Sequence, residues 1–482
     1  MRFALALLLS GCSLCAQDPR AIRDETLRLA AEPGLSSGRV GVLVADASTG
    51  EDLAALDADK AFLPASNMKL VSAAVALETL GPDFSFETRL EARGEIAGSV
   101  LQGDLLLVGG GDPTLGGGHP ASALAAFLPM ADALARLGVR TVRGRVLGVD
   151  DIQAEEHLGS GWQWDYLQEG YAAPFSGLNF ADNVVHLQVA GSAPGAPPHC
   201  RFTPDAHYLQ LLGGASCGPA DSEWTFRLER AAAGTVVRSA GLVPAGARER
   251  DLAVAVDNPT RYAAKALETA LGSAGIRHEG GVFDADEVPE SVGPAIEVAR
   301  IESEPLAAIV ERTLLESRNL WAEQIWRQAA QRCLGRSDTA SCAEHSLAVL
   351  GDLGVDSRGM ALEDGSGLSR RDLLTPRQIV RVLLAVRRKD YAGIFRRGLP
   401  VAGVSGTLKS RLLEGPARGH VRAKSGTLSR VVCLSGYIDR PNGRPPLVFS
   451  VMLNHFHCSG AEARAALDAF VQRLAAEAGW PP

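Results

Sequence analysis

Hydrophobic and polar positions predict a strand pair and then a buried helix in the first part of the chain. Val40, Val42 and Val44 alternate with small residues, as in a strand, and the turn Ala-Ser-Thr-Gly follows at residues 47–50. The apolar run from Leu70 to Leu77 leaves no polar face. Because a helix that is apolar all round is buried, this run is expected inside the core.

The pattern of apolar and turn-forming residues changes between residues 85 and 250. Short apolar runs alternate there with Gly/Pro turns, as in "SVLQGDLLLVGGGDPTLGGGHP". A helical pattern returns after Asp257-Asn258-Pro259. We therefore expect residues 20–84 and 251–482 to form one domain, interrupted by a strand-rich insertion at 85–250, which itself contains one or more domains.

The remaining pattern predicts an α+β fold. Helices are expected at 305–335, 376–389 and 460–479, and strands at 420–428, 431–439 and 445–456. The chain has no internal repeat, so a repeat architecture is not expected.

Composition and charge narrow the class of protein. The 482 residues are 46% hydrophobic and 22% charged, which is typical of a globular protein with two or three domains. The net charge is −8 and the basic residues are dispersed, so neither nucleic acid nor an anionic membrane surface is expected as a partner.

Lysine is scarce in this chain, so each lysine is a candidate for a specific role. Arginine supplies most of the 48 basic residues. The lysines are Lys60, Lys69, Lys265, Lys389, Lys409 and Lys424. Lysine can lose its proton when it is buried, whereas arginine cannot, so a retained lysine is a candidate for proton transfer.

The first sixteen residues have the pattern of an export signal. An early arginine precedes an apolar run from Phe3 to Leu9, which is too short to span a bilayer. Cleavage after Ala16 is one reading. The other is a lipoprotein signal, because Leu9-Ser10-Gly11-Cys12 resembles a lipobox and would place a lipid anchor on Cys12. Both readings put the mature protein outside the cytoplasm, in the periplasm or cell envelope.

Six cysteines follow the signal region and fall into local pairs. Exported proteins with an even number of cysteines commonly form disulfides. The expected bridges are Cys200–Cys217, Cys333–Cys342 and Cys433–Cys458. A zinc site at His455, His457 and Cys458 is the alternative, but the chain has no C-x-x-C motif, and no metal is expected.

The stretch "ASNMKL" contains the first candidate for chemistry. Ser66 and Lys69 stand at i and i+3, so they share one face at the start of the buried helix. Desolvation would lower the pKa of the Lys69 amine, and a neutral amine can take a proton from a serine hydroxyl. The alternative is a helix-end serine beside a lysine that extends to solvent.

Two further motifs favour catalysis at Ser66. Ser317-Arg318-Asn319 lies in an apolar helical stretch, and Lys424-Ser425-Gly426-Thr427 lies on a predicted strand. Each alone is explained by a helix-turn hydrogen bond or a solvated strand end. Together S-x-x-K, S-x-N and K-[S/T]-G occur once each and in this order, which is the serine/lysine set of penicillin-binding proteins and class A β-lactamases.

The chain resembles the D-Ala-D-Ala carboxypeptidase/endopeptidase family of penicillin-binding protein 4 type, the class C low-molecular-mass penicillin-binding proteins. "LPASNMKL", "LLVGGGDPTL", "ESRNLWAE", "EDGSGLSRRDLLTP" and "VRAKSGTLSRVVCLSGYI" resemble its signatures, over about residues 30–470. The long interval from Lys69 to Ser317 is similar to that of this family, which carries insertions between its first two motifs. The resemblance implies a serine β-lactamase/transpeptidase-like domain, with an antiparallel sheet and helices on both faces.

The resemblance also implies roles for the motif residues. Ser66 would be the nucleophile and Lys69 its base, while Ser317 and Asn319 would form the second wall of the cleft. Lys424, Ser425 and Thr427 would bind the terminal carboxylate of the substrate. The Gly426 position belongs to the same strand motif. The backbone N–H groups of Ser66 and Thr427 would form the oxyanion hole.

The implied substrates are peptidoglycan stem peptides ending in D-Ala-D-Ala, with β-lactams as covalent inhibitors and no cofactor. The sequence departs from the family pattern at three positions. Ser425 replaces the usual threonine, Arg318 is a bulky charge inside the second motif, and Asp372 stands where the family often has asparagine.

Two other functions remain open from the sequence. A β-lactamase or esterase on the same scaffold would need a route to fast hydrolysis of the acyl-enzyme. No clear E-x-x-x-N follows the second motif, and Glu323 lies on the predicted helix itself. A catalytically silent wall-binding protein is the second alternative, and the intact motif residues argue against it.

Overall fold

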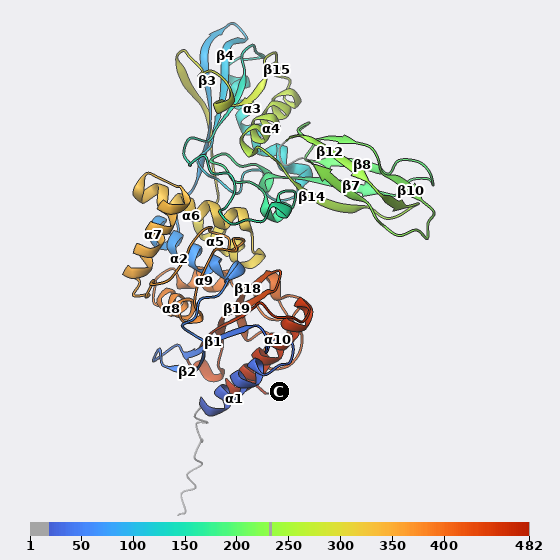
Figure 1. Cartoon of the computed structure of the whole chain (residues 1–482). Coiled ribbons are helices and arrows are strands. Elements are labelled where there is room, and N and C mark those ends of the chain that lie inside the picture. The colour runs from blue at the N-terminus through green and yellow to red at the C-terminus, as the bar shows by residue number, and fades with distance from the viewer. Residues whose placement is uncertain (1–18, 231–233, 482) are drawn as a thin grey trace, which may run out of the picture.

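The computed structural model describes residues 19–230 and 234–481 of the chain. Its body contains a five-stranded antiparallel sheet in the order β18-β19-β20-β1-β2. The strands are β1 (Arg39–Asp46), β2 (Asp52–Leu56), β18 (Val421–Leu428), β19 (Val431–Ile438) and β20 (Leu447–Asn454). Because β1 pairs with β20, the two ends of the sequence complete one sheet (Figure 1).

Helices cover both faces of this sheet, as predicted. On one face, α1 (Pro19–Ala30) and α10 (Gly460–Glu477) share a core with alternate residues of β19 and β20. The other face packs against a larger group of helices. These are α2 (Met68–Leu80), α5 (Leu306–Glu316), α6 (Asn319–Leu334), α7 (Thr339–Asp352), α8 (Pro376–Val386) and α9 (Ala392–Gly398).

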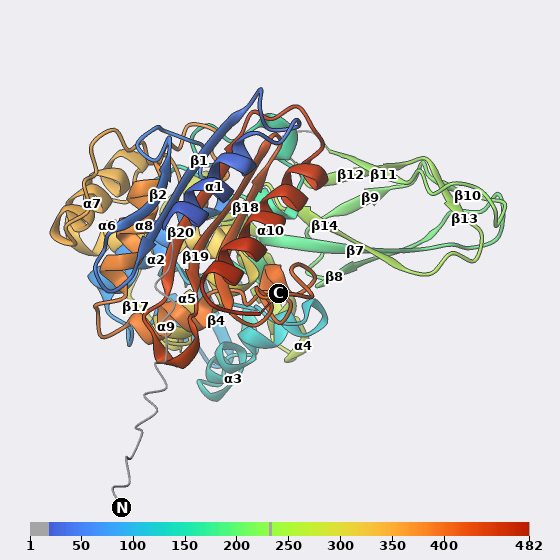
Figure 2. The same cartoon turned by 90° about the horizontal axis from the view of Figure 1, so that it is seen from below.

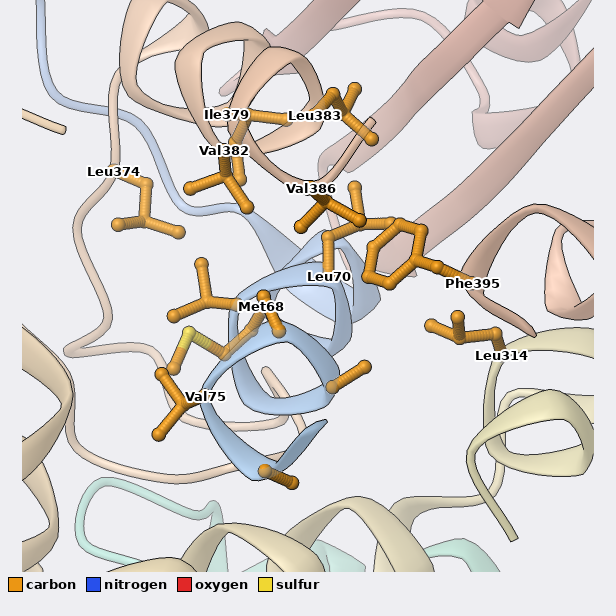
Figure 3. Close-up of a cluster of buried hydrophobic side chains, with 14 of the residues drawn as sticks. Met68, Leu70, Val75, Leu314, Leu374, Ile379, Val382, Leu383, Val386 and Phe395 are labelled. Atoms are coloured by element: carbon orange, nitrogen blue, oxygen red, sulfur yellow. The ribbon is translucent and has the colours of Figure 1, made fainter. Parts of the chain in front are cut away.

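Helix α2 is the centre of the second core. Every residue from Met68 to Leu77 is buried, which confirms the prediction from the apolar run. Figure 3 shows Leu70 of α2 among side chains of α8 and α9, including Val386 and Phe395. This packing holds the N-terminal end of α2, and with it the first motif, at a defined place beside the sheet.

A strand-rich insertion interrupts the body, and it is longer than predicted. Strand β17 (Ala295–Glu302) pairs with β3 (Glu87–Ala97), so the insertion ends where it began. Helix α4 (Pro259–Ser273) packs in the core of the insertion and not in that of the body. The predicted return to the first domain at residue 251 is therefore too early, because the helical pattern after Pro259 belongs to the insertion.

The insertion has two parts (Figures 1 and 2). The first is a seven-stranded sheet with α3 (Leu128–Arg136) and α4 against it. Its strands are β3, β4 (Val100–Val108), β5 (Thr141–Val142), β6 (Val146–Val149), β15 (Arg277–His278), β16 (Val282–Asp284) and β17.

The second part of the insertion is an elongated lobe of three small sheets, in the orders β14-β7-β8, β11-β12-β9 and β10-β13. Its strands are β7 (Val184–Ala190), β8 (His199–Thr203), β9 (Gln210–Leu212), β10 (Ser216–Gly218), β11 (Arg227–Arg230), β12 (Val236–Ala240), β13 (Leu242–Pro244) and β14 (Arg250–Ala255). Figure 2 shows this lobe extending away from the body.

The helical stretch predicted at 305–335 is broken at one residue. Ser317 ends α5 in the left-handed conformation, with φ 62°, and α6 starts at Asn319. The break turns the chain sharply between two buried helices. It places the second motif on a bend at the surface of the helical group, where its side chains can reach the first motif.

The three predicted disulfides are not formed, since all six cysteines of the described chain are free. Cys433 lies on the sheet face that packs against α2, whereas Cys458 packs against the core of the opposite face. Cys333 is exposed on α6, but Cys342 is buried and its thiol donates to the carbonyl oxygen of Ser337. Cys200 and Cys217 share one small core and remain thiols there.

The zinc site that was the alternative to disulfides is not assembled either. Within residues 19–230 and 234–481, the only group with the spacing of metal ligands is Asp150, Asp284 and Asp286, in the insertion. Its two buried members already accept hydrogen bonds from Ser176, Thr260 and Asn258. His455, His457 and Cys458 do not form such a group.

The predicted signal peptide of residues 1–16, with Cys12, lies outside the described residues. Among the residues that are described, no helix has the length and apolar character needed to cross a membrane.

Candidate active site

The first motif lies in a tight turn at the start of α2. A short 3₁₀ turn, Ala65–Asn67, precedes the helix, and Ala65 is left-handed with φ 47°. Two glycines from distant segments lie against it. A Cβ on Gly367 would come within 1.9 Å of the Ala65 carbonyl oxygen, and one on Gly426 within 3.1 Å of the Ser66 nitrogen. Glycine at these positions therefore lets two backbones close around Ser66.

Lys69 is completely buried and contacts three oxygens. Its Nζ lies 3.0 Å from Ser66 Oγ, 2.6 Å from Asn319 Oδ1 and 2.6 Å from the Ser366 carbonyl oxygen. The last two oxygens can only accept hydrogen bonds. A neutral amine has two hydrogens for these acceptors and one lone pair, which is left to accept the hydroxyl proton of Ser66. The geometry therefore suits a lysine that acts as a base.

The electrostatics agree with this geometry. Burial lowers the pKa of Lys69 to about 7, against the opposing effect of nearby carboxyl groups, chiefly that of Asp364. Asp364 is itself buried in a turn whose backbone N–H groups, from Ser366 to Ser369, point at its carboxylate. The same turn presents the Ser366 carbonyl oxygen to Lys69, so it both positions the amine and moderates its pKa.

The bend at Ser317 brings the second motif to the first. Asn319 accepts a hydrogen bond from Lys69 through Oδ1 and donates through Nδ2 to the Tyr171 carbonyl oxygen, at 2.7 Å. Tyr171 belongs to the insertion. The amide orientation of Asn319 is therefore set by one contact from each part of the fold.

Lys424 completes the constellation from β18. Its buried Nζ donates to Ser317 Oγ at 2.8 Å and to the Ser425 carbonyl oxygen at 2.9 Å. Burial, and secondarily the charge of Lys69, holds the pKa of Lys424 well below its usual range. In the described chain no carboxylate forms an ion pair with Lys424, so no protein anion stabilises the charged form of its amine.

The predicted binding residues are divided between the cleft and its wall. Thr427 lines a cleft of about 400 Å³ beside Ser66, whereas the Ser425 hydroxyl is bonded to Thr407 Oγ1 at 2.7 Å. The cleft is lined by Ser66, Tyr166, Tyr171, Ser317, Asn319, Gly367, Leu368, Thr427, Leu428 and Ser429. None of these lining residues carries a carboxylate.

Glu323 is the nearest acid on α6, and it is held away from the cleft. It is fully buried, where Oε1 accepts from Arg327 at 2.9 Å and Oε2 accepts from the Gly365 N–H at 2.6 Å. Burial raises the pKa of Glu323 to about 7, in spite of the Arg327 charge. Both oxygens are occupied, so this side chain is not placed to activate a water molecule in the cleft.

Sequence reasoning missed several residues of the site. Thr407, the Asp364 turn and Tyr171 contact the motif residues directly, but each lies far from them in sequence. The one available signal was the glycine-rich stretch "DGSG", in which a buried acid is followed by tight-turn residues.

The antiparallel sheet covered by helices on both faces, together with the three motifs that meet at the buried start of α2, defines a serine β-lactamase/transpeptidase-like protein. The fold is similar to that of penicillin binding protein 4 (DacB) from Haemophilus influenzae, with a TM-score of 0.81 at 24% identity over 94% of this chain and 98% of that one. The model of the D-Ala-D-Ala carboxypeptidase 3 (S13) family matches residues 24–476, and the chain belongs to this family.

Curated relatives agree with this family. A D-alanyl-D-alanine carboxypeptidase from Actinomadura sp. (strain R39) is 35% identical, over 98% of this chain and 89% of that protein. The D-alanyl-D-alanine carboxypeptidase DacB of Haemophilus influenzae is 26% identical over 90% of this chain and 89% of that protein.

Proposed function

We propose that the chain is a serine D-Ala-D-Ala carboxypeptidase that acts on peptidoglycan stem peptides through an acyl-enzyme on Ser66. The observation that carries the proposal is the buried Lys69 amine, 3.0 Å from Ser66 Oγ, with its two other contacts made to oxygens that only accept. This arrangement leaves the amine one role toward the serine, that of proton acceptor.

Acylation then follows from the positions of the groups. Ser66 gives its proton to Lys69, and Oγ forms a bond to the carbonyl carbon of the penultimate D-alanine. The N–H groups of Ser66 and Thr427 stabilise the resulting oxyanion. The peptide C–N bond breaks as the leaving D-alanine nitrogen takes a proton through Ser317, which lies 2.8 Å from Lys424 Nζ. Water later releases the acyl group.

Lys424 and Thr427 recognise the terminal carboxylate of the substrate. A buried lysine without an anionic partner favours any ligand that supplies one, because the pair restores the charged form. A bound carboxylate would therefore raise the pKa of Lys424 from its lowered value in the free protein. The Ser425 hydroxyl is hydrogen-bonded to the Thr407 hydroxyl, and this contact would hold the motif end of β18 in place.

A D,D-endopeptidase activity is proposed for the same site. An endopeptidase cleaves a bond of the same kind within a cross-link, and the chemical steps at Ser66 are unchanged. A predatory endopeptidase from Bdellovibrio bacteriovorus has a similar fold, with a TM-score of 0.52 at 16% identity over 92% of this chain. The substrate and the expected export signal both favour a location in the periplasm or cell envelope, with Cys12 as an alternative lipid anchor.

The β-lactamase alternative is disfavoured by Glu323. Fast hydrolysis of a penicilloyl-enzyme requires a base that activates water, and this carboxylate is bound by Arg327 and Gly365. We therefore expect a penicilloyl-enzyme that lasts for hours or longer.

Labelling with a fluorescent penicillin tests the proposal. The wild-type protein should be labelled and should release D-alanine from a pentapeptide, and Ser66→Ala should do neither while keeping its circular dichroism spectrum. Ser36→Ala, an exposed serine in a loop, is the control and should behave as wild type. D-Alanine release by Ser66→Ala at the wild-type rate would disprove the assignment of the nucleophile.

A further inference from the structure

A second cavity adjoins the catalytic cleft on the side of the insertion. Its volume is about 660 Å³, and it shares Tyr171, Ser317 and Asn319 with the cleft. Its other walls come from β11 and β14 of the elongated lobe, from the segment 168–173, from β7, and from Asp182, Arg318 and Leu320. The chemical steps proposed for removal of a terminal D-alanine take place in the cleft around Ser66 and assign no group of the substrate to this cavity.

The cavity lies between two strand edges. Strand β11 is the outer strand of the sheet β11-β12-β9, and β14 is the outer strand of the sheet β14-β7-β8. An edge strand presents backbone N–H and C=O groups that an extended peptide can pair with.

The backbone of β14 is oriented toward the cavity at alternate residues. The Ala255 N–H donates to the Gln168 carbonyl oxygen at 3.1 Å, so it points away from the neighbouring strand β7. Because hydrogen-bonding direction alternates along a strand, Ala253 and Asp251 present their backbone groups on the same side. Both residues line the cavity.

The edge of β11 shows the same arrangement from the opposite wall. The Arg230 carbonyl oxygen accepts from Gln168 Nε2 at 3.2 Å, which places Leu228, two residues earlier, with its backbone toward the cavity. Gln168 therefore bridges the two strand edges at one end of the cavity between β11 and β14, which is called the slot below. Gln168 and Glu169 already occupy this end of the slot like a short added strand, because Glu169 forms an antiparallel β-bridge with Val254.

The side chains of the slot suit a peptide. Apolar residues form much of the lining, namely Val184, Phe226, Leu228, Leu252 and Val254. Charges of both signs, Glu169, Asp251 and Arg227, also line it. Peptide-binding sites commonly combine main-chain pairing for affinity with such side-chain contacts for specificity.

We propose that this slot binds the second stem peptide of a peptidoglycan cross-link, as an extended strand added between β11 and β14, while the bond to be cleaved lies at Ser66. The inference rests on the proposed function, because it assigns the part of a cross-linked substrate that a single stem peptide lacks. It makes the slot a determinant of endopeptidase activity that leaves carboxypeptidase activity unaffected.

Variants of Ala253 and Leu228 test the slot. Ala253→Pro removes an N–H that points into the slot and leaves the bonds between β14 and β7 intact, since Ala253 is not in a hydrogen-bonded pair with β7. Ala253→Gly keeps the N–H and is the matched control. Leu228→Trp fills the slot from the other wall. The rates to measure are cleavage of a purified cross-linked muropeptide dimer, D-alanine release from a monomeric pentapeptide, and acylation by penicillin.

For Ala253→Pro and Leu228→Trp we expect kcat/KM for the dimer to fall roughly tenfold, mainly through KM, on the scale of one or two lost hydrogen bonds. Pentapeptide cleavage and penicillin acylation should stay within about twofold of wild type, which also reports correct folding. Unchanged dimer cleavage in both variants would overturn the inference, and so would an equal loss on dimer and pentapeptide. A wild-type protein that releases D-alanine but never cleaves the dimer would overturn it while leaving the carboxypeptidase proposal intact. A wild-type protein that does neither would overturn the proposed function itself.

Discussion

Arg318 Nη1 donates a hydrogen bond of 2.5 Å to Asp182 Oδ2, and the two residues belong to different parts of the fold. Arg318 lies in the second motif, whereas Asp182 lies in the insertion. The other oxygen of Asp182 accepts from the Trp321 indole at 2.7 Å, and the Arg318 guanidinium lies 4.9 Å from the Trp321 ring centroid. The unusual arginine of the motif therefore points out of the cleft and ties the insertion to the bend at Ser317.

The hydrogen bond between Arg318 and Asp182 predicts that the insertion holds the bend at Ser317, and with it the second motif, in the position needed for catalysis. Asp182→Ala should lower the penicillin acylation rate about tenfold, because the left-handed Ser317 and the start of α6 lose a charge-assisted anchor. Glu316→Ala, which removes the other hydrogen-bonded partner of Arg318 from within the body, is the control and should have a smaller effect. Equal rates for Asp182→Ala and wild type would show that the ion pair does not position the motif.

The lowered pKa of Lys69 predicts a pH-dependent acylation rate. With a pKa of about 7, the amine is charged below this pH and free to accept a proton above it. The second-order acylation rate should therefore rise about tenfold per pH unit below pH 7 and level off above it. A rate that is flat between about pH 5 and pH 9 would contradict this role of Lys69.

Lys424→Arg should keep the fold and some binding but lower the acylation rate by about 10²-fold or more, the usual scale for loss of a positioned proton-transfer group. The compact ammonium fits 2.8 Å from Ser317 Oγ, where a guanidinium fork would crowd the serine and cannot give up a proton. Rates with penicillin and with a D-Ala-D-Ala peptide check this. Lys409→Arg is the matched control, because Lys409 is exposed. Near-wild-type rates for Lys424→Arg would reduce this lysine to a general positive charge.

The buried pair of Glu323 and Arg327 predicts an effect on stability. Both side chains are fully buried, and Glu156 is the second carboxylate partner of Arg327. Glu323→Ala would therefore leave the buried guanidinium with one carboxylate partner in place of two, and it should lower the free energy of unfolding by about 3 kcal/mol. Urea denaturation measures this. Glu344→Ala, which breaks an exposed pair with Arg336, should cost less than about 1 kcal/mol. Similar decreases in the free energy of unfolding for Glu323→Ala and Glu344→Ala would show that burial of the first pair does not set the size of the effect.

The sequence by itself determined the local parts of this protein. The apolar run after Lys69 predicted the buried helix α2, and the pattern of the last hundred residues predicted β18, β19 and β20 close to their observed bounds. The i, i+3 spacing of Ser66 and Lys69 predicted that their side chains meet. These features depend on neighbours along the chain, because helix and strand periodicities set which residues share a face.

Tertiary structure alone decided how distant segments meet. The pairing of β17 with β3 extended the insertion beyond the predicted boundary, and the left-handed Ser317 broke a stretch that reads as continuous helix. The sheet placed Cys433 and Cys458 on opposite faces, although their sequence spacing suggested a bridge. The contact of Asn319 with Tyr171 likewise has no sequence signature. Such contacts arise from the packing of whole elements, where burial and long-range hydrogen bonds outweigh local preference.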